Sequence, residues 1–168
     1  MPAIRLSKIV IAFGLALFAF LAGLGNITDY NSNWAFVQHV LAMDTIFPDS
    51  KLKWRAVTDP TLQAAAYWAI IAAEFLTALA FAAATIAMIR ALKAPKIEFQ
   101  RAKRFAAWGV AAGFALWFVG FMAIGGEWFA MWQSKAWNGQ SAAFAFSVTI
   151  LVAGIYILLD NDAKPLGD

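Results

Sequence analysis

The sequence predicts an all-α polytopic membrane protein, folded as an antiparallel four-transmembrane-helix bundle with a short outer amphipathic helix. Hydrophobic residues make up 62% of the chain and charged residues 14%, which is too apolar for a soluble protein of 168 residues. Four apolar stretches approach the roughly 20 residues that cross a bilayer as a helix. Basic residues gather in alternate connections, as they do in multi-pass proteins. We expect one membrane domain, residues 1–168.

The four predicted spans cover, approximately, residues 9–27, 62–92, 105–128 and 142–159. Because three further spans follow, we interpret the first as a retained span and not as a signal peptide. The second begins after Asp59, which can cap a helix, and Pro60, which suits a first helical turn. Pro95 separates the second span from the third. The short connections between the last three spans favour antiparallel neighbours.

The distribution of Lys and Arg predicts the orientation. Nine of the 13 basic residues fall on the side of the two termini and of the connection between spans two and three. Because positive loops stay in the cytoplasm, both termini are predicted to be cytoplasmic. Residues 29–61 and 128–141 should then face outward, and we expect the protein in a bacterial inner membrane.

The outer segment 29–61 contains the stretch NSNWAFVQHVLAMDTIFP, which predicts a short amphipathic helix near residues 33–44. Its candidate caps are Asn31, Ser32 and Asn33. We expect Arg55 to form an ion pair with one of the aspartates of this segment.

Tryptophans are concentrated at the outer boundary, where six of the eight are predicted to lie. Indole favours the headgroup region, so an aromatic belt with packing under the outer loop is one reading. A docking surface for a partner is the other, because tryptophan dominates interface hot spots. The candidate partner surface comprises Trp34, Trp128, Trp132 and Trp137. We also expect the outer helix to pack on residues 127–140, so that Trp34 or Phe36 contacts one of the last three tryptophans.

Three ionisable residues are candidate functional groups: Glu74, His39 and Glu127. Glu74 lies deep in the second span, where an acid is a functional hypothesis by default. His39 has Asp44 nearby but no tight ligand spacing, and Glu127 lies at the outer end of span three. The chain has no cysteine and one histidine, which excludes thiolate and multi-histidine metal sites. We therefore expect no metal site and no catalytic set.

The structural alternative for Glu74 is a neutral carboxyl that faces the bundle interior and stabilises helix packing. At 1.5 Å per residue, four hydrogen-bonding groups lie at a matching depth. These predicted partners are Ser147, Thr149, Trp117 and Thr77.

Two outer segments also carry a resemblance. The stretches DYNSNWAFVQHVLAMDTIFP and EWFAMWQSKAWNGQSAAFAF resemble a bacterial family of predicted small integral membrane proteins of unknown function. The resemblance covers nearly the whole chain, with both stretches in order. It implies a four-span inner-membrane protein and supplies no catalytic residue.

Three function classes remain open. The first is an accessory or scaffolding subunit of a larger membrane complex, docking through the outer tryptophans. The second is a small-molecule transporter, and the third is a quinone- or lipid-binding protein or an enzyme that uses Glu74. The sequence favours the first class and a protein that is not an enzyme. We expect the bilayer and other membrane subunits as partners, and no nucleic acid. We expect no cofactor, although a tightly bound lipid is compatible with the sequence.

Overall fold

The structure is a computed structural model that describes residues 2–162, and within them it contains helices and no strands. Four helices are long and apolar enough to cross a membrane, which confirms the predicted fold class. The elements are α1 (Pro2–Thr28), α2 (Tyr30–Ala42), η1 (Lys53–Arg55), α3 (Pro60–Arg90), α4 (Lys96–Ala102), α5 (Arg104–Phe114), η2 (Ala115–Trp128), η3 (Met131–Gln133) and α6 (Gln140–Leu158).

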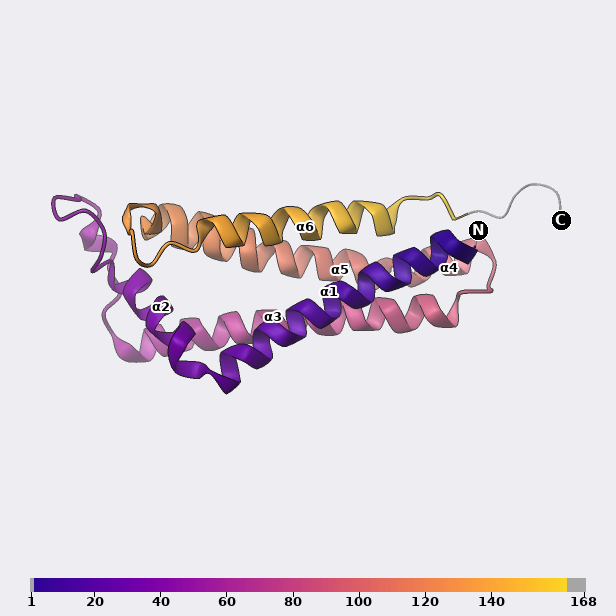
Figure 1. The fold of residues 1–168 in the computed structure, drawn as a ribbon, viewed down its shortest axis with the longest axis horizontal. Coiled ribbons are helices and arrows are strands. Elements are labelled where there is room, and N and C mark those ends of the chain that lie inside the picture. Colours follow the sequence, from indigo (N-terminus) through magenta and orange to yellow (C-terminus); the bar gives the residue numbers. More distant parts are fainter. Residues whose placement is uncertain (1, 163–168) are drawn as a thin grey trace.

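The long helices run antiparallel, with α5 and η2 forming one continuous rod beside α6 (Figure 1). The start of α1, the connection from α3 to α4 and the end of α6 lie at one end of the bundle, here called the inner end. The connections from α1 to α3 and from η2 to α6 lie at the opposite, outer end. This arrangement matches the predicted alternation of loops.

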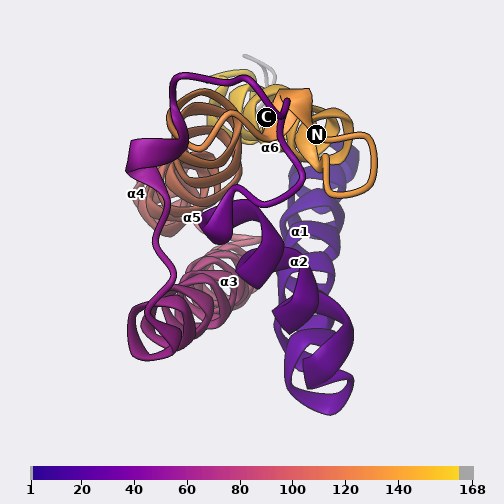
Figure 2. The same cartoon turned by 90° about the vertical axis from the view of Figure 1, so that its left-hand side faces the viewer.

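Helix α1 crosses the bundle obliquely. It begins beside the end of α6, and its far end packs against α3, away from η2 and α6 (Figures 1 and 2). At the inner end Ser7 and Tyr156 share a hydrogen bond of 2.7 Å between their hydroxyl oxygens. The oblique course leaves a space between α1 and α6 in the outer half, and α2 closes the outer end of that space.

Helix α3 begins where the sequence predicts. The Asp59 carboxylate accepts hydrogen bonds from the backbone N–H groups of Thr61 (2.8 Å) and Leu62 (3.1 Å). These two bonds hold the pKa of Asp59 below its ordinary value. Helix α2 differs from its prediction, because it begins at Tyr30 after Asp29 and not at a cap among residues 31–33. Ser32 instead donates to the Asp29 carboxylate at 2.8 Å.

Small residues let the helices approach closely. A Cβ on Gly109 would lie 2.9 Å from the Phe81 ring, and one on Gly113 would lie 2.8 Å from Ile150. The pair 109–113 therefore accommodates side chains from α3 and α6, as expected for a GxxxG motif at a helix contact.

The outer half of the third span departs from an ordinary α-helix. Residues Ala115–Trp128 are π-helical, with backbone bonds spanning five residues and not four. Within this segment Trp117 packs against Phe18 of α1 and Phe146 of α6, and Phe121 stacks on Phe36 of α2. Since π-helical turns often occur at functional sites, this departure draws attention to the space that they line.

Candidate functional site

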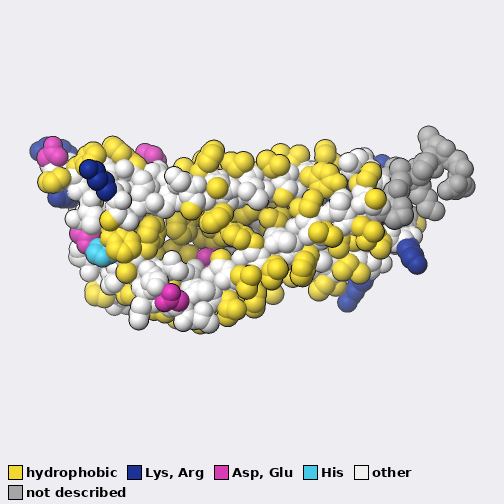
Figure 3. Space-filling view, viewed as in Figure 1, with side chains coloured by type: hydrophobic (Ala, Val, Ile, Leu, Met, Phe, Trp, Pro, Cys, Tyr) yellow, Lys and Arg dark blue, Asp and Glu magenta, His cyan; other side chains and the backbone are white. Residues whose placement is uncertain are grey.

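A cavity of about 400 Å³ occupies the space between α1 and α6, and we call it the Glu74 cavity. Figure 3 shows it as a hollow in the outer half of this face, with acidic atoms at its floor. Its volume falls within the range of about 300–1,000 Å³ typical of small-molecule sites. It is lined by Phe18, Leu21, Ala22, Gly25, Asn26, Asn33, Phe36, Val37, Tyr67, Ile70, Glu74, Trp117, Phe121, Gly139, Ala142, Ala143 and Phe146.

Glu74 faces the bundle interior, as predicted, and is 5% exposed. Its two carboxylate oxygens both accept from the side-chain amide of Asn26, at 2.9 and 2.7 Å. Tyr67 in turn donates its hydroxyl to the Asn26 backbone carbonyl at 3.0 Å. These three side chains form a polar group on one wall of an otherwise largely apolar cavity.

The predicted partners of Glu74 are wrong. Ser147, Thr149 and Thr77 each donate to a carbonyl four residues earlier in their own helix, at 2.7–2.8 Å. Each hydroxyl proton is therefore used in a hydrogen bond within its own helix and is not donated to Glu74. Trp117 lines the cavity and packs against Phe18, with ring centroids 5.5 Å apart.

Asn26 was missed because it falls at the end of the first predicted span, which places it at the membrane boundary. Glu74 follows Pro60 by 14 residues, or roughly 21 Å along α3. The two meet because α1 ends short of the outer end of the bundle, and α2 continues from there toward that end (Figure 1). The only signal in the sequence was an isolated amide near the end of an apolar stretch.

The other two candidate residues lie outside the Glu74 cavity. His39 contacts Asp44 through Nδ1 at 2.7 Å and stacks on Trp137 with ring centroids 4.6 Å apart. Glu127 is exposed at the outer end of η2. No cluster of three potential metal-binding side chains occurs among residues 2–162.

The predicted outer cap forms through Phe36. Its ring contacts that of Trp137 with centroids 6.3 Å apart, and the tip of the ring also fills the space beside Gly139. Trp34 takes no part in this contact, because it stacks on Tyr30 at 6.0 Å. The cap therefore joins α2 to the connection before α6 and closes the outer end of the cavity.

The outer tryptophans Trp128 and Trp132 stay about half exposed, at 47% and 48%. Trp128 meets Trp54 edge to face at 5.9 Å, and Trp132 meets Phe47 in the same way at 5.9 Å. Arg55 lies over the Trp128 ring at 4.5 Å and donates to the Trp128 carbonyl at 3.1 Å. The expected ion pair between Arg55 and an aspartate does not occur among the described residues, because the guanidinium is held by this aromatic surface.

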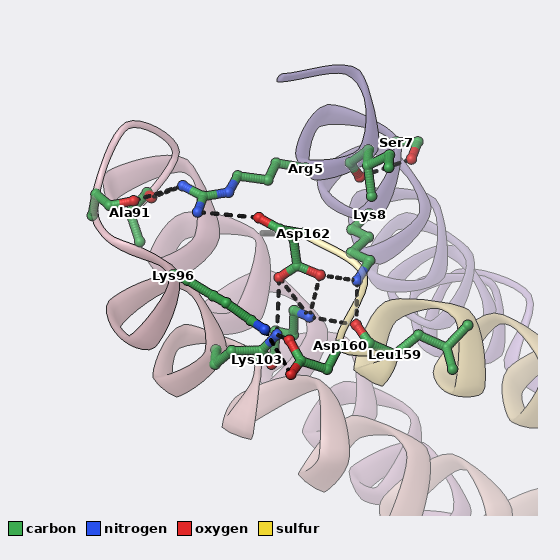
Figure 4. A network of polar contacts seen from close by, with 12 residues as sticks. Arg5, Ser7, Lys8, Ala91, Lys96, Lys103, Leu159, Asp160 and Asp162 are labelled. Atoms are coloured by element: carbon green, nitrogen blue, oxygen red, sulfur yellow. Dashed lines mark hydrogen bonds and ion pairs between the residues drawn. The ribbon is translucent and has the colours of Figure 1, made fainter. Parts of the chain in front are cut away.

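Sequence reasoning also missed a buried ionic cluster at the inner end, drawn in Figure 4. Lys8 and Lys103 are 0% and 2% exposed, and both form salt bridges with Asp162, which is fully buried. Both ammonium groups also donate to the Leu159 carbonyl. Arg5 extends the cluster by donating to the Leu92 carbonyl at 2.9 Å.

These contacts set the ionisation of Asp162. Burial raises the pKa of this carboxyl, but the hydrogen bonds from Lys103 and Lys8 lower it by more, so the net pKa lies below the ordinary value. The cluster joins the start of α1 to Lys103, at the junction of α4 and α5, and to the segment after α6. We interpret it as a structural clasp, because its charged groups are bonded to one another and to backbone carbonyls.

Searches of curated proteins and of solved structures found no match. The family model described as "Predicted small integral membrane protein (DUF2165)" matches residues 4–160, nearly the whole chain. Together with the four spanning helices, this match shows that the chain belongs to that family of integral membrane proteins.

Proposed function

We propose that this protein binds a small amphipathic molecule, drawn from the bilayer, in the Glu74 cavity. The observation that carries the proposal is the buried pair of Glu74 and Asn26 on the wall of an apolar cavity within the spanning region. A few placed polar groups within an apolar lining are typical of small-molecule sites. This is the binding-protein alternative that the sequence left open.

The position of the cavity supports a ligand that arrives through the membrane. The hollow lies on the side of the bundle, between α1 and α6 (Figure 3), while Phe36 and Trp137 close the outer end. A molecule dissolved in lipid would therefore enter sideways. Its apolar part would contact rings such as Phe18 and Phe146, and its polar group would reach Glu74.

Binding is better supported than catalysis. Among the residues lining the cavity, Tyr67 is the one titratable side chain besides Glu74. Its hydroxyl already donates a hydrogen bond to a backbone carbonyl. A general acid–base mechanism needs a group within reach of the substrate that can accept or release a proton in turn. A single carboxylate held by an amide suits recognition instead.

Two glycines of α1 offer a matched test. A Cβ at Gly25 or at Gly14 meets nothing within 4 Å, so a side chain at either position begins in open space. Gly25 lines the cavity, whereas Gly14 is exposed on the outside of the same helix. Gly25→Leu should place its side chain in the cavity and leave less space for a ligand, whereas Gly14→Leu should leave the cavity unchanged.

The measurement is native mass spectrometry of the protein released from its membrane in mild detergent. The wild type and Gly14→Leu should retain a stoichiometric small-molecule adduct that Gly25→Leu lacks. Equal adducts on all three proteins, or none on the wild type, would contradict the proposal. Melting temperatures of the two variants check that both remain folded.

A second candidate function is the accessory subunit docking at the outer end. It is supported by an exposed aromatic surface of Phe47, Trp54, Trp128 and Trp132, whose exposed fractions range from 47% to 72%. A photoreactive amino acid in place of Trp132 should crosslink to one discrete membrane protein. The same replacement at Trp108, which is 70% exposed at the inner end, is the control. Identical crosslinks from both positions would count against docking.

A further inference from the structure

We infer that the ligand of the Glu74 cavity is a lipophilic organic cation, an ammonium or other onium group carried on an apolar body. This inference rests on the proposed function and assigns the chemical class of the molecule bound. It depends on the charge, the aromatic lining and the hydrogen bonds of the cavity.

The charge balance of the cavity is the first observation. Glu74 supplies its one carboxylate, and no lysine, arginine or histidine belongs to the described lining. An ionised carboxylate without a cation is costly in apolar surroundings. A bound cation removes that cost, whereas a neutral ligand leaves it in place and an anion increases it. The cavity therefore discriminates by charge in favour of cations.

The aromatic lining is the second observation. Six aromatic side chains, contributed by all the elements that form the walls, surround the space: Phe18, Phe36, Tyr67, Trp117, Phe121 and Phe146. The face of an aromatic ring attracts a cation, and several rings around one site are the usual means of holding a quaternary ammonium. Such rings also suit the apolar body of the same molecule.

The hydrogen bonds of the polar group are the third observation. Asn26 donates to both oxygens of Glu74, so the amide holds the carboxylate in place as an acceptor. Each oxygen can accept more than one hydrogen bond, which leaves capacity for a ligand. An onium group would meet this held acceptor on one side and aromatic rings on the others.

The test uses the full chain in lipid nanodiscs and two probes of nearly identical shape and opposite charge, tetraphenylphosphonium and tetraphenylborate. Radiolabelled tetraphenylphosphonium should bind saturably, and tetraphenylborate should show no binding above protein-free nanodiscs. Glu74→Gln should weaken cation binding roughly 30-fold or more, as expected when one member of a buried charge pair is lost. Glu127→Gln removes an exposed outer charge and should change affinity by less than about twofold.

Glutamine at position 74 keeps the shape of the side chain and an oxygen for Asn26, so the variant should fold; circular dichroism and melting check this. Saturable binding of tetraphenylborate that matches the cation, or equal cation binding by Glu74→Gln and wild type, would overturn the cation inference. So would the absence of saturable cation binding. In each case the comparison of Gly25→Leu with Gly14→Leu still decides whether the cavity holds a ligand at all.

Discussion

Replacing Asp162 by asparagine tests the inner clasp, because it removes one negative charge and keeps the shape of the side chain. Lys8 and Lys103 are each at most 2% exposed, and both contact this carboxylate. Removing one partner of a buried ion pair costs about 3–5 kcal/mol, since the other charge stays buried without compensation. For a chain of this size, 1 kcal/mol corresponds to about 2–4 °C in melting temperature, so the loss should be roughly 6–20 °C.

Asp160 provides the matched control two residues away. Its carboxylate pairs with Lys96 at 2.9 Å, but the two side chains are 62% and 43% exposed. Exposed pairs contribute about 0–1 kcal/mol, so Asp160→Asn should lower the melting temperature by at most about 4 °C. Thermal unfolding in one detergent, followed by tryptophan fluorescence, measures both variants. Equal shifts would refute the idea that burial makes the Asp162 contacts strong.

The same carboxyl predicts a pH dependence. Because the folded-state pKa of Asp162 is lowered, its stabilising effect is fully present above the ordinary value of about 3.9 and disappears as pH falls through the lower folded-state value. Acidification below about pH 4 should therefore destabilise the wild type more than Asp162→Asn. Parallel losses in both proteins would show that other carboxyls govern acid unfolding.

Three further predictions concern packing and orientation. Gly154→Ala should lower stability by about 1–3 kcal/mol in a thermal melt, because its Cβ would lie 2.3 Å from Val110. Adding Val110→Ala should restore most of the lost stability. If it restores none, the destabilising clash does not involve Val110. Trp137→Ala should destabilise the protein more than Trp132→Ala, because only the first side chain holds the outer cap; the reverse order would contradict the cap. Alkaline phosphatase fused within the connection from α2 to α3 should be active, and fused between α3 and α4 inactive, with the opposite result reversing the predicted orientation.

The sequence by itself determined the membrane class and the number of spans, because these follow from the length and composition of apolar stretches. It also located the start of α3, since the capping signal of Asp59 and Pro60 acts within three residues. The interior position of Glu74 followed from the cost of an acid facing lipid. Each of these properties depends on local chemistry or on solvent.

Tertiary structure decided the partners of the charged and polar groups. Asn26 meets Glu74 only because α1 ends short of the outer end and crosses α3 obliquely, and no periodicity in the sequence encodes that angle. Likewise, Lys8 and Lys103 look like ordinary cytoplasmic charges until the segment after α6 brings Asp162 between them. Contacts between residues 48 to 154 positions apart depend on how whole helices pack, which the order of the residues along the chain does not reveal.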